Sequence, residues 1–171
     1  MYNGNVGGDI MHIDIIDLKT NHLKNIELDE YITFDEDKIK SSELLDLKDV
    51  HIKGIIFKDS LDDYQISADV TGIMVLPCSI TLKPVTHKFS TKLEGSIIEM
   101  LEEIDENIKN VENSIDILPI IWENILVEIP SKVVSEEANN INLKGDGWQL
   151  ITDDTRKSTI NPELEKLKDL L

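Results

Sequence analysis

A strict alternation of apolar and polar residues between Tyr64 and Leu76 constrains the fold of this chain more than any other feature. The run YQISADVTGIMVL places on one side of an extended chain Ile66, Ala68, Val70, Gly72, Met74 and Leu76, and on the other Ser67, Asp69 and Thr71. Successive side chains of a β-strand point to opposite faces of a sheet, so the pattern predicts a strand with one buried and one solvated face.

Two further strands are predicted beside this one. The segment 50–58 precedes it across a polar, turn-rich link at 59–63, and the segment 85–93 follows it. In segment 85–93 the inward positions are Val85, Phe89 and Leu93, and the outward positions are Thr86, Lys88, Ser90 and Lys92. Short links between consecutive strands favour an antiparallel meander. A short alternation, broken by Asp14 and Asp17, predicts a strand at 11–19, and a weaker strand is predicted at 24–34. The polar segment 35–49 is expected to be a loop, with or without a helical turn at 42–47.

The period of the apolar residues changes after residue 114. In SIDILPIIWENILVEIP a wide stripe with helical spacing is formed by Ile117, Leu118, Ile121, Trp122, Ile125, Leu126 and Ile129. Ser114 or Asp116 can cap a helix here, Pro119 fits its first turn, and Pro130 ends it. The acidic stretch 102–113 before it is expected to be a solvated loop.

These segments predict an α+β fold. An antiparallel β-meander sheet packs against one long amphipathic helix, Asp116–Ile129, and a short C-terminal helix begins at Asn161 and Pro162. Residues 11–171 are expected to form a single domain, in which 134–160 make an extended and partly mobile excursion. Residues 1–10 precede a second methionine, Met11, and are expected to be either a remnant of an expression tag or a flexible native arm.

The charge of the chain is strongly negative and unevenly distributed. There are 17 basic and 34 acidic residues, a net charge of −17. The segment 70–93 contains no acidic residue and three lysines, which leaves 14 basic and 34 acidic residues elsewhere. Such a balance repels nucleic-acid backbones unless the charges are segregated on the surface. The acid-free segment is therefore the place to look for an RNA contact.

The candidate binding residues are Lys83, His87, Lys88, Lys92 and Arg156. Lys88 and Lys92 share their predicted strand face with two hydroxyl groups, and together these groups can contact phosphate oxygens. The alternative is that lysines on an exposed strand face only protect the sheet from pairing with other chains. Arg156 is the only arginine, whereas guanidinium groups usually dominate RNA recognition.

The residues predict no metal site and no cofactor. Cys78 is the only cysteine, and Thr81 stands where a C-x-x-C pair would have its second thiol. The four histidines are dispersed, and no glycine-rich phosphate loop or catalytic serine motif is present. We expect Cys78 to be a small buried residue beside the bend at Pro77. A single cysteine fits a reducing compartment, and no run of 18 apolar residues occurs, so a cytoplasmic location without membrane contact is expected.

An ordered series of motifs resembles the YceD family, the large ribosomal RNA subunit accumulation proteins. The pattern V-x-G-x-x-x-x-x-C-x-x-x-L-x-P-V is carried by Val70, Gly72, Cys78, Leu82, Pro84 and Val85. Then follow D-I-x-P-x-x-x-E-x-x-L-x-x-x-P at 116–130, Trp148, and N-P-x-L-x-x-L-x-x-L at 161–170. The chain departs from the family pattern at Thr81, at Ser135 and Glu136, and at Glu163. The first three replace Cys or His of many members, so any metal binding by relatives is not carried over, and Glu163 replaces an arginine that could contact RNA.

The resemblance implies a bacterial or plastid protein linked to the accumulation of large-subunit (23S) ribosomal RNA, without established catalytic activity. We therefore predict a non-catalytic ribosome-biogenesis factor. It would bind precursor RNA through the acid-free segment, or hold a basic 50S ribosomal protein against its acidic faces. The two routes stay open at this point. The alternative class is a small hydrolase of unknown substrate that uses carboxylates and a histidine such as His87.

Overall fold

The computed structural model describes residues 6–7, 10–105, 113–139, 144–145 and 148–149. The chain separates into two compact units, Met1–Val133 and Val134–Leu171. The second unit begins at the residue where the sequence predicts the excursion to start.

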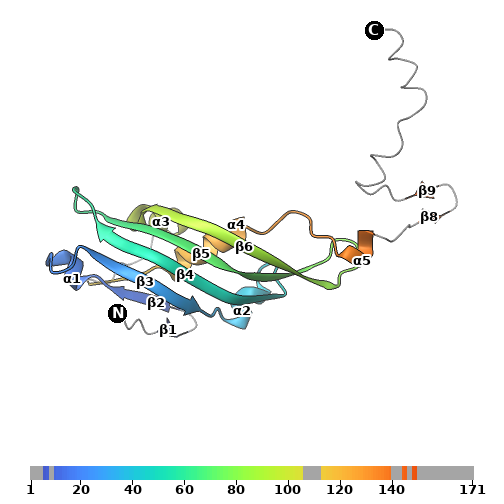
Figure 1. Cartoon of the computed structure of the whole chain (residues 1–171), viewed down its shortest axis with the longest axis horizontal. Coiled ribbons are helices and arrows are strands. Elements are labelled where there is room, and N and C mark those ends of the chain that lie inside the picture. Colours follow the sequence, from blue (N-terminus) through green and yellow to red (C-terminus); the bar gives the residue numbers. More distant parts are fainter. Residues whose placement is uncertain (1–5, 8–9, 106–112, 140–143, 146–147, 150–171) are drawn as a thin grey trace, which may run out of the picture. The chain divides into compact units, whose positions relative to one another are not determined.

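A four-stranded antiparallel sheet forms the centre of the first unit, in the order β3-β4-β5-β6 (Figure 1). Its strands are β3 (Asn25–Ile32), β4 (Asp46–Lys58), β5 (Tyr64–Pro77) and β6 (Pro84–Ser96). Each strand pairs with the next one in the chain, which confirms the predicted meander. In β5 the side chains of Ile66, Ala68, Val70, Met74 and Leu76 are buried, as the alternation predicts. In β6 Phe89 and Leu93 are buried on the same face.

A second layer covers the buried face of this sheet. It contains the small sheet β1 (Val6–Gly7), β2 (Ile10–Asp14) and β7 (Ser114–Asp116), together with the helices α3 (Ile97–Ile104) and α4 (Leu118–Val127). Buried side chains of β2, β7, α3 and α4 join those of the sheet in one hydrophobic cluster. The mixed α+β class is therefore confirmed.

The long amphipathic helix was predicted wrongly in its length and its faces. Helix α4 has 10 residues, because the chain from Ser114 to Asp116 pairs with β2 as strand β7. The Asp116 carboxylate accepts hydrogen bonds from the backbone N–H groups of Leu118 and Met11, at 3.0 Å each, and so holds the strand-to-helix junction. Pro119 lies in the first turn, as predicted. Buried residues surround most of the helix, namely Leu118, Ile120, Ile121, Trp122 and Ile125, so it is a core helix without a wide polar face.

Three short helices of the first unit were not predicted from the sequence, and neither was α5 (Glu136–Asn139) of the second unit. Helix α1 (Ile16–Lys19) replaces the second half of the strand expected at 11–19, and α2 (Glu36–Lys40) lies in the segment expected to be a loop. Helix α3 begins before the acidic stretch and includes its first residues. The Ser96 hydroxyl caps α3 by accepting the N–H of Glu99 at 3.3 Å. Segments of four to eight residues are too short to establish a helical period in the sequence.

The second unit contains α5 (Glu136–Asn139) and an antiparallel pair of short strands, β8 (Lys144–Gly145) and β9 (Trp148–Gln149). The predicted C-terminal helix and Arg156 lie outside the described residues. Most of the segment 1–10 lies outside them as well. None of the helices in the described ranges has the length and the apolar character needed to cross a membrane.

Candidate functional site

The face of the central sheet that points away from the core carries most of the polar side chains of interest; we call it the outer face. Cross-strand register arranges its residues in rows across the strands, two from β3 to β6 and a third from β4 to β6. The charged row consists of Asp29, Lys53, Asp69 and Lys92, and the next, the aromatic row, of Tyr31, His51, Thr71 and Ser90. Beyond a register shift in β4, the third row consists of Lys48, Ile73 and Lys88.

The structure brings some of the predicted residues together and separates others. Lys88 and Lys92 are exposed on the outer face, beside the exposed residues Thr86 and Ser90, as the strand pattern predicts. His87 is half-buried on the opposite face, where it pairs with Met74 in the register, so it does not join the lysines. Lys83 lies in the turn between β5 and β6 and is exposed. The role of these residues in binding stays a prediction.

A cluster at the β3 side of the outer face was missed by the sequence analysis. The rings of Tyr31 and His51 lie 4.5 Å apart, centroid to centroid, at an interplanar angle of 36°. The carboxylate of Asp29 lies 2.7 Å from Nε2 of His51 and 3.1 Å from Nζ of Lys53. The hydrogen bond from Lys53, and next the one to His51, lowers the pKa of Asp29 below its ordinary value of 3.8. The alternation of buried residues in both strands places Tyr31 and His51 outward, but only the register makes them neighbours.

The outer face is nearly neutral, in contrast to the rest of the chain. The three rows hold four lysines and two aspartates, and the residues just beyond them add Glu27, Glu94 and Asp46. Cations there are interleaved with acids: Lys53 pairs with Asp29, Lys48 with Asp46 at 3.1 Å, and Lys92 lies opposite Asp69 in the register. No acidic residue occurs in the aromatic row or in the third row.

The single cysteine lies in a compact turn between β5 and β6. Cys78 is fully buried, as predicted, and the N–H of Thr81 points to its sulfur at 3.5 Å. The backbone closes the turn with the hydrogen bonds Cys78 N–H to Lys83 O at 2.8 Å and Leu82 N–H to Cys78 O at 2.9 Å. Leu82 has a left-handed backbone conformation, with φ of 59°, and its side chain is 76% exposed. A bulky residue rarely adopts this conformation.

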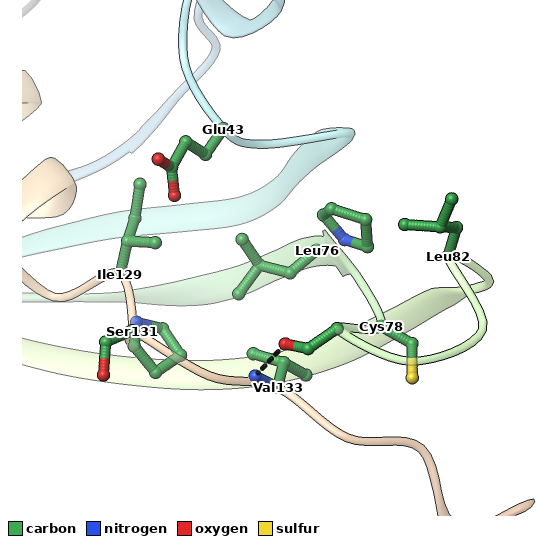
Figure 2. A pocket seen from close by; sticks show the side chains of 10 residues that line it. Glu43, Leu76, Cys78, Leu82, Ile129, Ser131 and Val133 are labelled. Atoms are coloured by element: carbon green, nitrogen blue, oxygen red, sulfur yellow. Dashed lines mark hydrogen bonds between the residues drawn. The ribbon is translucent and has the colours of Figure 1, made fainter. Parts of the chain in front are cut away.

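This turn forms one wall of a cavity of about 180 Å³ (Figure 2). The opposite wall is the segment after α4, which is fastened to the turn through Ser79. The Ser79 N–H donates to Val133 O at 2.7 Å, and the Ser79 hydroxyl accepts the N–H of Val133 at 3.2 Å. The lining is mostly apolar, with one carboxylate, and consists of Glu43, Leu76, Pro77, Cys78, Ser79, Leu82, Ile129, Pro130, Ser131 and Val133.

The lining of this cavity does not provide a pair of groups for acid–base catalysis. Glu43 is its single carboxylate and no histidine is present, so His87, which the hydrolase alternative named, has no place in it. Within the described ranges there is also no group of three or more His, Cys, Asp or Glu side chains placed to hold a metal ion. The cavity offers shape and apolar surface for contact.

Comparisons with known proteins agree with the ordered motifs. The family model described as "Large ribosomal RNA subunit accumulation protein YceD" matches residues 66–171. The protein of Bacillus subtilis (strain 168) described as "Uncharacterized protein YlbN" is 34% identical over 157 residues, which cover 86% of this chain and 89% of that protein. No solved structure matches the chain significantly. Neither description mentions a catalytic activity. The family match and the extent of the relative show that this chain belongs to the YceD family of large ribosomal RNA subunit accumulation proteins.

Proposed function

We propose that this protein is a non-catalytic factor that acts in the cytoplasm and promotes the accumulation of large-subunit (23S) ribosomal RNA by binding its precursor through the outer face. The family description supports the link to this RNA. The observation that carries the choice of surface is the three rows of the outer face, where four lysines stand against two aspartates beside an exposed tyrosine. No cofactor or membrane has a part in the proposal.

A net charge of −17 is compatible with RNA contact at this face. At about 0.1 M salt the Debye length is ~10 Å, so acidic residues on the other side of the protein are largely screened from RNA held here. The overall charge would still slow the approach of RNA and disfavour weak, non-specific complexes. The expected result is a short-range contact that requires Lys88 and Lys92 and that weakens as the salt concentration rises.

A charge-reversal experiment tests this proposal. In the test variant Lys83, Lys88 and Lys92 are replaced together by Glu. In the control variant the same replacement is made at three exposed lysines, namely Lys19 in α1, Lys24 in the link before β3 and Lys40 in α2. Binding to a large-subunit RNA precursor is measured by filter binding at several salt concentrations. We expect the test variant to lose binding and the control, with the same net charge, to retain most of it.

Equal binding by the wild type and the Lys83, Lys88 and Lys92 variant would contradict the proposal. Equal losses in both variants would mean that only the total charge matters and that the outer face has no special role.

A basic protein of the large subunit is the second candidate partner. The observation that favours it is the charge outside segment 70–93, where 34 acidic residues stand against 14 basic ones. Such a surface attracts Lys- and Arg-rich proteins at long range. We expect, on this route, that purified 50S proteins freed of RNA bind the immobilised chain at low salt. An empty pull-down under these conditions would remove the candidate.

A further inference from the structure

We propose that Tyr31 and His51 form a stacking platform for an unpaired base of single-stranded RNA. This inference rests on the proposed RNA binding and names a site within the outer face. Tyr31 is 69% exposed and lies on β3, which is an edge strand of the sheet. An aromatic ring so exposed gives a flat surface that every base can contact through its π-face.

The platform is held in place before any ligand arrives. The His51 side chain is only partly exposed, with 23% of it accessible, and its ring lies tilted beside that of Tyr31, with the centroids 4.5 Å apart. Asp29 fixes the imidazole through the 2.7 Å contact with Nε2, while Lys53 holds the other carboxylate oxygen at 3.1 Å. Because these groups are already ordered, a base that stacks on them loses little of its binding free energy to the ordering of side chains.

The neighbours of the platform fit the rest of a nucleotide chain. Thr71 and Ser90 continue the aromatic row toward β6 and offer hydroxyl groups to base edges or to ribose hydroxyls. The charged row and the third row lie on either side of the aromatic row, and each ends on β6 in a lysine, Lys92 in the charged row and Lys88 in the third row. With a spacing of ~4.8 Å between strands, β3 and β6 lie ~14 Å apart. RNA that crosses the sheet would thus meet aromatic rings first and lysines last.

The residues around Tyr31 and His51 also distinguish the platform from a cross-strand aromatic pair that only stabilises the sheet. Cross-strand aromatic pairs do stabilise sheets, and Tyr31 pairs with His51 in the register. The aromatic row that contains them holds no carboxylate, whereas in the neighbouring charged row, which begins at Asp29, acidic and basic residues alternate. The exposed Tyr31 ring is therefore accompanied by hydroxyl groups and flanked by rows that contain lysines, an arrangement that suits a stacked nucleotide and that sheet stability does not need.

The test compares single-residue variants of the full chain. The probe is a labelled single-stranded RNA of about 12 nucleotides with mixed sequence, and the readout is fluorescence polarisation. The variants are Tyr31→Ala and Tyr31→Phe, with Leu61→Ala as a control that also shortens an exposed side chain, 85% accessible, in the turn between β4 and β5. Stacking on one aromatic side chain changes affinity by roughly five- to 150-fold.

We expect Tyr31→Ala to lose at least about five-fold in affinity for the single strand, within that range, while Tyr31→Phe and Leu61→Ala bind like the wild type. The slope of log affinity against log salt should stay unchanged in Tyr31→Ala, since no phosphate contact is removed. Circular dichroism of each variant checks the fold, and Tyr31→Phe keeps the test meaningful if the alanine variant is unstable.

Three results would overturn the inference in different ways. If Tyr31→Ala binds like the wild type while the Lys83, Lys88 and Lys92 variant does not, the platform is wrong and the proposed RNA binding stands. If Tyr31→Phe loses as much as Tyr31→Ala, the phenol hydroxyl and not stacking is responsible. If the wild type binds no RNA but captures basic large-subunit proteins, the RNA route itself is wrong and the platform with it.

Discussion

Thr81 illustrates what a single residue contributes to the turn after β5. Its hydroxyl oxygen is buried and has no hydrogen-bond partner within the described protein, while its backbone N–H points to the sulfur of Cys78. A buried hydroxyl without a partner costs free energy, because it has lost its bonds to water. The position where a second metal-binding cysteine was sought thus holds a side chain whose polar atom does not stabilise the fold.

A substitution at this residue has a predictable sign. Thr81→Val keeps the shape of the side chain and removes the orphan hydroxyl, so we expect the free energy of unfolding to stay equal or to rise by up to about 1 kcal/mol. Ser79→Ala serves as the control, since the Ser79 hydroxyl accepts the N–H of Val133, and it should lose about 1 kcal/mol. Urea unfolding measures both. A clear destabilisation by Thr81→Val would show that the hydroxyl is satisfied in solution, for example by water.

Strands β5 and β6 show how one element depends on the next. Gly72 lies opposite Phe89 in the register, and a Cβ atom added to Gly72 would lie 2.7 Å and 2.8 Å from two atoms of the Phe89 ring. The ring therefore occupies the space that a side chain would need, and it is itself buried. This close approach explains a glycine inside a strand, where it otherwise weakens the sheet.

We predict that Gly72→Ala destabilises the protein by about 1–3 kcal/mol, because the buried ring must leave its position. Thermal or urea unfolding gives the value. The matched control is Ser90→Ala, an exposed position on β6, where a change within about 0.5 kcal/mol is expected. If Gly72→Ala were more stable than the wild type, the ring would have room to move, and the usual gain of replacing a strand glycine would dominate.

At the scale of the whole molecule, added salt is expected to act on folding and on binding in opposite directions, because the chain carries a net charge of −17 and the proposed contact with RNA is made by lysines. Mutual repulsion of the acidic residues destabilises the compact state, and added salt screens it. The proposed contact with RNA is itself electrostatic and weakens in salt. One chain should therefore become more stable and bind less tightly over the same range of ionic strength.

This opposition is measurable with two titrations. Between about 10 and 200 mM NaCl the Debye length falls from ~30 Å to less than ~10 Å, and we expect the melting temperature to rise by a few degrees. Over the same range the affinity for the large-subunit RNA precursor should fall. A melting temperature that does not change with salt would indicate that the acidic residues are balanced locally by cations in the folded state.

Much of the sheet and part of the site were predictable because they depend on local pattern. The alternation at 64–76 and 85–93 predicted the strands, their buried faces and the outward position of Lys88 and Lys92. Asp116 was expected to cap a helix, and its carboxylate does accept the N–H of Leu118. The motifs in their order predicted the family. Each of these features follows from residues close together in the chain, where side-chain spacing alone decides the outcome.

The remaining features were decided by the tertiary structure. Strand β7 forms in place of the first helical turn because β2, about a hundred residues earlier in the chain, pairs with it. Tyr31 meets His51 only through the register of β3 with β4, and the Cys78 turn meets Val133 only through packing after α4. The sequence by itself determined which side chains are buried or exposed in the strands. Which exposed side chains become neighbours was decided by contacts between distant segments, whose free energy no local pattern contains.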